Sequence, residues 1–247
     1  MIKHHPTSNV LSGFVAGDLP ASVAIIVASH VELCRECANH VQQLTEQAAM
    51  QAFDMTADDD WLNDQVQLGD TSPQHINDID HDGIDSNDME LACDSRAMID
   101  AITASPAQVK SAVAQTVTEI EVAGQRISLP RAMKSIGLRE WQGLGKLSRA
   151  RLALDDDELR ASLLHIDKGG SVPCHTHKGF EITLLLQGSF DDEMGHYTAG
   201  DFIWLDGDHT HQPITQEGCV CLTVSSDAIH FTQGMSQLLN PIGRFIY

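Results

Sequence analysis

Apolar side chains near the start of the chain recur with the period of an α-helix. They fall every three or four positions and make one broad face, formed by Val23, Ile26, Val27, His30, Val31, Cys34 and Cys37. Pro20 suits the opening turn of this helix, and Asp18 just upstream is a candidate capping group. A shorter helix is predicted over Asn9–Ala16, ended by Gly17, and a further helix over Asn39–Phe53. The N-terminal region is therefore predicted to be helical.

The pattern changes from Ile127 onward to short apolar runs separated by Gly, Asp and Pro. The runs are Leu163–Ile166, Ile182–Leu186, Phe202–Leu205 and Val220–Val224. Short strands at this spacing are typical of an all-β sandwich or barrel. The two patterns together predict an α+β chain of two domains: a helical domain at residues 1–105, a linker at 106–126 and a β domain at 127–247.

The middle of the chain is strongly acidic. Between Asp54 and Asp100 there are 14 Asp and Glu residues against one Arg. Such a composition buries too little apolar surface to offset its ordering entropy, so a flexible acidic insert is predicted near residues 55–90. Leu91–Ile102 is expected to form a helix that returns to the helical domain, and Ala107–Glu121 another.

One motif within the acidic insert resembles a calcium loop. Asp78, Asp80, Asp82 and Gly83 begin like an EF-hand, but the closing position that requires a bidentate Glu holds Met89. A solvated acidic segment is the better interpretation.

Charge narrows the classes of function. The formal net charge of -20 argues against direct binding to nucleic acid or to an anionic membrane, because such surfaces need clustered Lys and Arg. No apolar run of about 18 residues and no signal peptide is found, so a cytoplasmic protein is expected. Six cysteines could form disulfides in a secreted protein, but their clustering with His favours metal binding in a reducing compartment.

A first set of candidate ligands lies in the helical region. On one helix His30, Cys34 and Cys37 would share a face, and two thiolates with an imidazole suit zinc at a structural site. The fourth ligand is expected to be His5, with His4 as the alternative and His40 less favourably placed. The competing interpretation is two buried cysteines and a surface histidine that bind nothing.

A second set lies in the β region. His175, His177 and Glu181 share parity, so in extended backbone their side chains point to one face, and His211 from another strand completes the set. His209 is the competitor of His211. The spacing from Gly169 to Gly188 follows the first cupin motif, and the segment from Gly200 to His211 its counterpart, although Asp206 and Asp208 stand where that pattern usually has Pro and Gly. Three imidazoles and a carboxylate accept Zn²⁺ or another divalent transition metal.

With both sets in place, the chain resembles the ChrR family of zinc-binding anti-sigma factors. The resemblance covers most of the chain and rests on the His4–His5 pair, the segment Phe14–Pro20, the His30/Cys34/Cys37 triplet and the cupin ligands. It implies a small zinc-stabilised helical bundle joined to a cupin barrel. It also implies that zinc is held by His5, His30, Cys34 and Cys37 and a second metal by His175, His177, Glu181 and His211.

The same resemblance implies a function and a partner. An anti-sigma factor of this kind binds an extracytoplasmic-function sigma factor and releases it after oxidative stress, singlet oxygen or organic hydroperoxide, sensed through the cupin domain. The acidic insert is longer than the family pattern suggests. An acidic inhibitor would also complement the basic surfaces with which a sigma factor meets DNA.

Two alternatives stay open. The chain could be a metal-dependent cupin enzyme of dioxygenase or isomerase type with a structural zinc domain, or a zinc-dependent adaptor for some other protein. Three cysteines of the β region, Cys174, Cys219 and Cys221, are either oxidisable sensors near the metal or small core side chains.

Overall fold

The computed structural model of the chain describes residues 1–53, 97–105, 116–156 and 158–232. The chain divides into two compact units, one formed by residues 1–53 and 114–247 and the other by residues 54–113. In the second unit, residues 97–104 are helical, which covers the end of the helix predicted over Leu91–Ile102. The predicted acidic insert and its calcium-like motif lie outside the described residues, as does the return of that helix to the N-terminal region.

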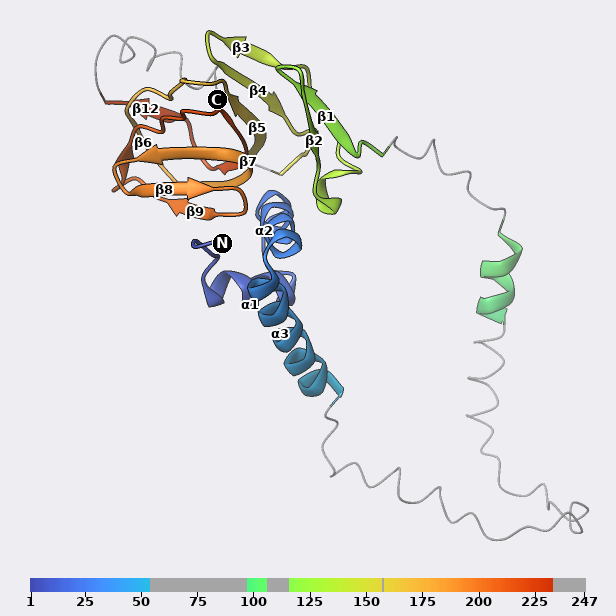
Figure 1. The fold of residues 1–247 in the computed structure, drawn as a ribbon. Coiled ribbons are helices and arrows are strands. Elements are labelled where there is room, and N and C mark those ends of the chain that lie inside the picture. The colour runs from blue at the N-terminus through green and yellow to red at the C-terminus, as the bar shows by residue number, and fades with distance from the viewer. Residues whose placement is uncertain (54–96, 106–115, 157, 233–247) are drawn as a thin grey trace, which may run out of the picture. The chain divides into compact units, whose positions relative to one another are not determined.

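Three helices open the first unit (Figure 1). Helix α1 (Ser8–Ala16) begins where the Thr7 hydroxyl accepts the backbone N–H of Val10, and it ends at Gly17, whose φ of 77° is the left-handed conformation that favours glycine. Helix α2 (Ala21–Leu33) follows Pro20, as predicted.

The cap of α2 comes from a distant part of the chain. The Asp156 carboxylate accepts the backbone N–H groups of Ala21 (3.3 Å) and Ser22 (2.6 Å). These are two of the donors that a helix N-terminus leaves without intrahelical partners. Pro20 at the N-cap makes no side-chain hydrogen bond, and Asp18 is therefore not the capping group that the sequence suggested.

The predicted helix through the first ligand set is interrupted. Cys34 has extended backbone (φ -113°, ψ 107°), and helix α3 (Arg35–Phe53) begins immediately after it. His30, Cys34 and Cys37 therefore do not lie on one continuous helix face, and α3 begins four residues before the predicted Asn39. Neither Gly nor Pro marks this break, which is why hydrophobic periodicity alone missed it.

The β part consists of two sheets and a hairpin. A seven-stranded antiparallel sheet has the order β3-β4-β5-β11-β7-β8, with β9 paired to β7, and a three-stranded sheet has the order β10-β6-β12. The seven-stranded sheet contains β3 (Gln142–Leu144), β4 (Leu147–Arg151), β5 (Arg160–Ile166), β7 (Glu181–Asp192), β8 (Gly195–Thr198), β9 (Phe202–Leu205) and β11 (Cys219–Ser225). The smaller sheet contains β6 (His175–His177), β10 (Thr210–His211) and β12 (Ile229–Phe231). All four strand positions predicted from the sequence are confirmed.

A hairpin corrects the prediction of a helix that extends to Glu121. Strand β1 (Glu119–Val122) pairs with β2 (Gln125–Ser128), and Ala123 and Gly124 form the turn with φ of 51° and 75°. Positive φ at both central positions is the geometry that two-residue hairpins favour. The alternation of buried Ile120 and Val122 with exposed Glu fits a strand with one buried face. A 3-10 turn, η1 (Arg131–Met133), follows the hairpin.

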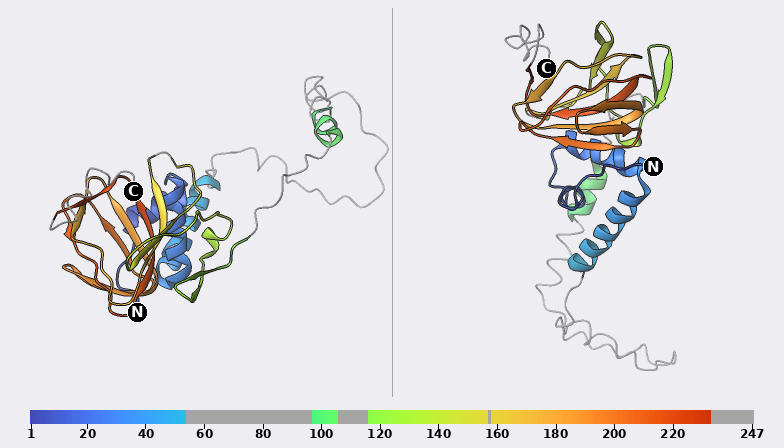
Figure 2. Two further views of the ribbon diagram at one scale, coloured as in Figure 1. Left: turned by 90° about the horizontal axis from the view of Figure 1, so that it is seen from above. Right: turned by 60° about the vertical axis from the view of Figure 1, so that its left-hand side comes forward.

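The large sheet buries both of its faces. On one face, Leu163, Ile182, Leu184 and Leu222 share a hydrophobic core with Val23, Ile26 and Val27 of α2. On the other face, inside the barrel, a second core contains Ile166, Leu185, Phe190, Cys219 and Cys221. Successive side chains of a strand alternate between faces, so one sheet supplies both cores. Helix α2 therefore packs directly on the outside of the barrel, and α3 extends away from the barrel, as two further views show (Figure 2).

Among the described residues, no single helix is long and apolar enough to cross a membrane. Only α1 and α2 taken together, across a bend of 113°, reach that length and composition.

Candidate metal centres

The first candidate centre, here called the helical cluster, is formed by His5, His30, Cys34 and Cys37. His5 precedes α1, His30 lies in the last turn of α2, Cys34 occupies the break, and Cys37 lies in the first turn of α3. One ligand atom from each residue lies within 4.8 Å of the others. The Nδ1 atom of His5 is 3.4 Å from both sulfur atoms, and Nε2 of His30 is 3.3 Å from Cys37 Sγ.

The hydrogen bond made by His30 directs a nitrogen lone pair into the helical cluster. His30 donates its Nδ1–H to the carbonyl oxygen of Gly200 (2.9 Å), because a carbonyl can only accept, so Nε2 presents a lone pair to Cys37. Burial lowers the pKa of His30 to about 4, and the ring is neutral at pH 7. Burial, reinforced by the nearby Cys34, raises the pKa of Cys37 to about 12. A divalent cation would supply the charge that two thiolates need here, and two imidazoles with two thiolates fit tetrahedral zinc.

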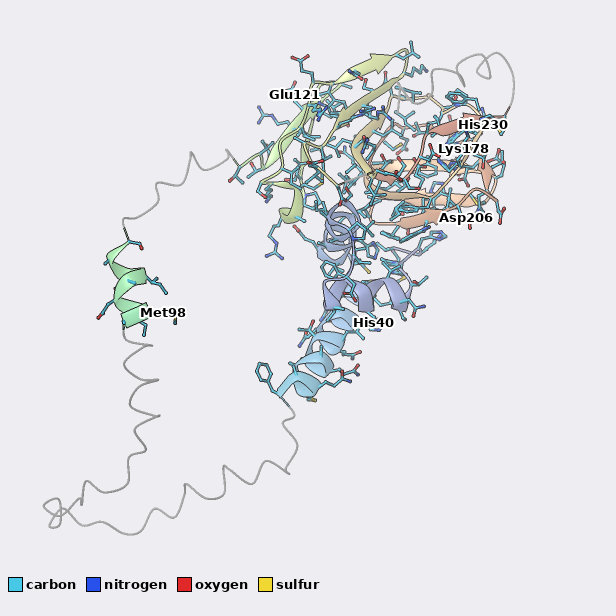
Figure 3. All side chains as sticks on the ribbon, turned by 180° about the vertical axis from the view of Figure 1, so that it is seen from behind. His40, Met98, Glu121, Lys178, Asp206 and His230 are labelled. Atoms are coloured by element: carbon cyan, nitrogen blue, oxygen red, sulfur yellow. The ribbon has the colours of Figure 1, made fainter. Side chains whose placement is uncertain are left out.

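The alternative histidines lie elsewhere. The ring of His4 packs against Tyr197, with centroids 4.8 Å apart, and His40 lies on α3 outside the cluster (Figure 3). Of the three candidates for the fourth ligand, the structure brings His5 to the other ligands.

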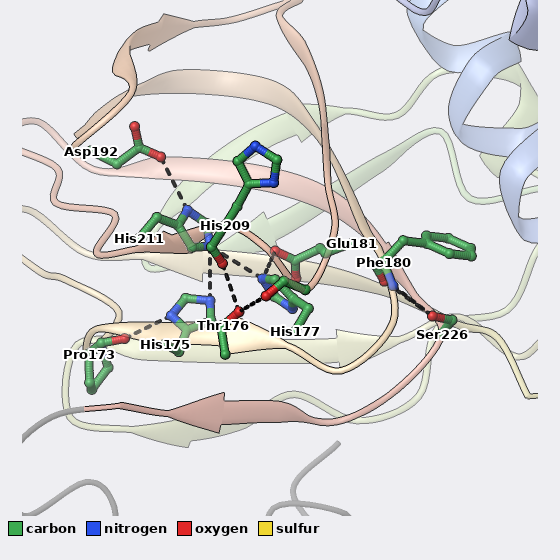
Figure 4. A network of polar contacts seen from close by, with 11 residues as sticks. Pro173, His175, Thr176, His177, Phe180, Glu181, Asp192, His209, His211 and Ser226 are labelled. Atoms are coloured by element: carbon green, nitrogen blue, oxygen red, sulfur yellow. Dashed lines mark hydrogen bonds and ion pairs between the residues drawn. The ribbon is translucent and has the colours of Figure 1, made fainter.

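The second candidate centre, here called the barrel cluster, is formed by His175, His177, Glu181 and His211. His175 and His177 lie on β6, Glu181 begins β7, and His211 on β10 is paired directly with His175. The Nε2 atom of His211 is 3.1 Å from that of His175 and 3.3 Å from that of His177, and Glu181 Oε2 is 3.3 Å from His177 Nε2 (Figure 4). All four ligand atoms lie within 4.8 Å of one another.

His175 and His211 each direct Nδ1 to an acceptor outside the barrel cluster. His175 donates its Nδ1–H to the carbonyl oxygen of Pro173 (2.8 Å), and His211 donates its Nδ1–H to the Asp192 carboxylate (3.1 Å). When both rings are neutral, each has only this one N–H, and the two Nε2 atoms present lone pairs to each other at 3.1 Å. Two facing lone pairs repel, and a cation between them removes the repulsion. The residues present therefore fit a divalent metal ion.

Burial keeps His175 and His177 neutral and makes the carboxyl group of Glu181 hard to ionise. Burial, together with a smaller effect of the neighbouring imidazoles, lowers the pKa of His175 to about 4 and that of His177 to about 3. It raises the pKa of Glu181 to about 7. These directions apply to the metal-free site; a bound cation favours the ionised carboxylate.

The competitor His209 is turned outward. Its ring is about half exposed and pairs with the Asp206 carboxylate at 2.7 Å. The same carboxylate accepts the backbone N–H of Asp208 at 3.1 Å, and its hydrogen bond with His209 lowers the pKa of Asp206. Aspartate thus builds this turn through its side chain at the positions where the cupin pattern usually has Pro and Gly.

A cavity of about 400 Å³ lies inside the barrel and reaches three members of the barrel cluster. His175, Glu181 and His211 line it on one side. Most of the remaining wall is apolar and includes Leu164, Ile166, Phe190, Ile229 and Phe231. A space of this size would hold roughly a dozen water molecules, at about 30 Å³ each, or a small organic molecule.

The three described cysteines outside the helical cluster are buried. Cys174 accepts a hydrogen bond from the Thr232 hydroxyl at 3.3 Å, and Cys219 and Cys221 belong to the inner core of the barrel. No disulfide joins the five described cysteines. Their packing favours the role of small core side chains, although Cys221 also lines the cavity.

Two residues that contact the clusters, and a third that contacts residues 1–7 before α1, here called the N-terminal arm, were not found from the sequence. Asp192 binds His211, Gly200 binds His30, and the buried Asp201 binds the N-terminal arm. Each is far from its partner along the chain, and no local motif marks it.

Comparison with known proteins agrees with this architecture. Residues 134–228 match the family model described as the ChrR cupin-like domain. The anti-sigma-E factor ChrR of Cereibacter sphaeroides is 27% identical over 246 residues, which cover 98% of this chain and 99% of that protein. The chain is a homologue of ChrR.

A solved structure shares the fold of this ChrR homologue. The crystal structure of Rhodobacter sphaeroides SigE in complex with the anti-sigma ChrR matches with a TM-score of 0.57 and 24% identity, covering 91% of this chain and 100% of the matched chain. The α+β class, with helices in the N-terminal region and a cupin-like β barrel after them, is thereby confirmed.

Proposed function

We propose that this ChrR homologue is an anti-sigma factor that binds an extracytoplasmic-function sigma factor in the cytoplasm. The observation that carries the proposal is the helical cluster, two imidazoles and two thiols within 4.8 Å, in a chain similar to an anti-sigma factor along nearly its whole length. Zinc there would join the N-terminal arm, α2 and α3. Zinc bound to Cys34 and Cys37 would catalyse no reaction; its role would be structural.

The end of α3 offers a surface for such a partner. Met50 and Phe53 are 68% and 83% exposed. Among the described elements, α3 makes extensive contact with α1 and α2 only. Large exposed apolar side chains on one helix are typical of a protein-binding face. The net charge of -20 would also steer a basic sigma surface toward the chain.

The proposed release signal is oxidative stress, singlet oxygen or an organic hydroperoxide, registered through the barrel cluster. A metal ion there, zinc or another divalent transition metal, would supply a Lewis-acidic or redox-active centre beside the cavity. His175, His177, Glu181 and His211 would hold it, and Asp192 would orient His211.

Sigma binding can be tested by co-expression of the full chain with the candidate sigma factor, followed by affinity purification. A stable one-to-one complex is expected for the wild type, and its loss for the double variant Cys34→Ser/Cys37→Ser. His40→Ala, on α3 but outside the cluster, is the matched control and should retain the complex. A complex of normal stability with the double variant would contradict the zinc-dependent mode of binding.

Sensing can be tested with a sigma-dependent reporter. His177→Ala should keep inhibition in unstressed cells and blunt induction by singlet oxygen or hydroperoxide. Induction at full strength in that variant would show that the barrel metal is not the sensor.

The cavity favours one second candidate, a metal-dependent cupin enzyme of dioxygenase or isomerase type. A pocket of about 400 Å³ beside three metal-ligating groups is a common form of an active site. Turnover of a small molecule by the metal-loaded full chain, lost in Glu181→Gln while the sigma complex persists, would support an enzyme in addition to the regulator.

A further inference from the structure

The N-terminal arm that carries His5 is anchored to the barrel by one buried carboxylate. The side chain of Asp201, at the turn between β8 and β9, is fully buried. Its Oδ1 atom accepts the backbone N–H groups of Lys3 (2.6 Å) and His4 (3.0 Å), and its Oδ2 atom accepts the backbone N–H of Thr198 (2.8 Å). Burial alone raises the pKa of Asp201, but these hydrogen bonds outweigh it and lower the pKa, so the group is ionised at pH 7.

The residues on either side of Asp201 contact His30 and the backbone next to His5. The Gly200 carbonyl accepts Nδ1–H of His30 at 2.9 Å, and the ring of Phe202 lies edge-on to that imidazole, with centroids 5.6 Å apart. The backbone N–H of Phe202 donates to the carbonyl of His4, next to His5 (3.0 Å). Three consecutive barrel residues therefore hold His30 and the backbone next to His5.

Gly200 adopts a backbone conformation and a close contact that disfavour any other residue. Its φ is 95°, and a Cβ placed there would lie 2.5 Å from the side chain of Ile2. The N-terminal arm is thus seated closely on this turn, which only glycine fits.

The other end of the same strand reaches the barrel cluster. Strand β9 has four residues; Phe202 pairs with Leu184, and Leu205 pairs with Glu181. At about 3.3 Å per residue the strand spans roughly 10 Å. One short strand therefore contacts a ligand of the helical cluster at its start and is hydrogen-bonded beside a ligand of the barrel cluster at its end.

We propose that the segment from Gly200 to Leu205 couples the two metal centres, with Asp201 as the positioning residue that makes the helical cluster part of the barrel. The inference rests on the proposed function in that both clusters hold metal. A metal ion on Glu181 fixes the start of β7 and its partner β9, and β9 in turn holds His30 and the His5 arm in place. Binding at one centre then raises affinity at the other, and by linkage the effect is reciprocal. Through this segment, binding or loss of metal at the barrel cluster would change the metal affinity of the helical cluster.

Cobalt titration of the full chain separates the two centres. Only the helical cluster has sulfur ligands, so thiolate-to-cobalt charge-transfer absorption reports that centre alone. Affinity is measured in competition with a chelator for the wild type, Asp201→Asn, Glu181→Gln and the double variant. Asp206→Asn is the matched control, because this carboxylate follows β9 at its other end and pairs only with surface groups.

Asp201→Asn is expected to weaken cobalt binding at the sulfur site by about 10-fold, the lower end of the loss for removing a hydrogen-bond partner of a metal ligand, because Asp201 holds the backbone next to His5. Glu181→Gln is expected to weaken it about threefold or more, although Glu181 is not a ligand of that site. In the double variant, Glu181→Gln should cause no further loss of cobalt affinity, because Asp201→Asn has already uncoupled the two centres. Asp206→Asn should bind as the wild type does.

Unchanged affinity in a folded Asp201→Asn protein would overturn the positioning role, and unchanged affinity in Glu181→Gln would overturn the coupling. If Asp201→Asn fails to fold, Thr198→Val carries the test, since it removes only the hydroxyl donor at 3.2 Å; a loss of about threefold supports the proposal and no loss overturns it. Absence of the charge-transfer band from the wild type would instead refute zinc binding in the helical cluster, and with it the proposed function.

Discussion

His211 donates its Nδ1–H group to the Asp192 carboxylate at 3.1 Å, and both side chains are almost completely buried, at 4% and 1% exposure. The hydrogen bond selects the tautomer of His211 that presents Nε2 to the barrel cluster. Burial tends to raise the pKa of Asp192, but its hydrogen bonds, that to His211 first among them, outweigh burial and lower it. Asp192 therefore acts on the candidate metal through His211.

Asp192→Asn should weaken metal binding at the barrel cluster by about 10- to 100-fold, because an amide orients the imidazole less strongly than a carboxylate does. Chelator competition on the full chain measures the loss. Asp191→Asn is the control, since Asp191 is exposed and pairs with the exposed His196. Equal metal affinity in both variants would show that the Asp192–His211 contact does not tune the site.

The metal-free chain should lose stability in mild acid. The pKa values of His30, His175 and His177 are lowered in the folded chain to about 4, 4 and 3, from 6.5. Between about pH 6.5 and 4.5 the unfolded chain therefore binds up to three protons on these groups that the folded chain does not. Glu181 works in the opposite direction, because its folded pKa is raised to about 7 from 4.5 and it gains one proton in the folded state.

The difference, three protons minus one, leaves up to two more on the unfolded chain. The free energy of unfolding should thus fall as the pH falls through this window, by at most about 3 kcal/mol per pH unit. Urea unfolding of chelator-treated protein at several pH values measures the slope. His177→Gln should flatten it; a slope that is zero or inverted in the wild type would contradict the prediction.

Asp156→Ala should lower the free energy of unfolding by about 1 kcal/mol, the usual effect of removing a helix N-cap. The carboxylate accepts two N–H groups at the start of α2, and no other side chain caps that end. Thermal unfolding monitored by circular dichroism measures the loss. Asp155→Ala, at the exposed neighbouring position, should change stability little. An equal loss of stability in both variants would indicate that it comes from removing a negative charge from the loop, and not from removing the cap of α2.

Zinc should stabilise the chain through the helical cluster. At free zinc a thousandfold above the dissociation constant, one site adds about 4 kcal/mol to the free energy of unfolding. Cys34→Ser/Cys37→Ser should lose the contribution of this site and keep that of the barrel cluster. Denaturant titrations with and without zinc measure both contributions, and His40→Ala serves as the control. Full zinc stabilisation in the double cysteine variant would place the effect entirely in the barrel.

Local spacing was sufficient to predict four strand positions, the first two helices and most members of the two ligand sets. His175, His177 and Glu181 follow the two-residue period of extended backbone, and that period holds wherever the strand packs. His211 followed from the cupin-like spacing. The zinc and metal assignments themselves stay predictions until an ion is measured.

Only the tertiary structure decided the break at Cys34, the choice of His5 over His4, and the contacts of Asp156, Asp192 and Asp201. Asp201 and Lys3 are 198 positions apart, and Asp156 caps a helix 134 positions away. A buried carboxylate needs hydrogen-bond donors, and which backbone N–H groups reach it depends on how the helices pack on the sheet. Sequence periodicity indicates which face of its own helix or strand a residue occupies. It does not indicate which distant element packs against that face.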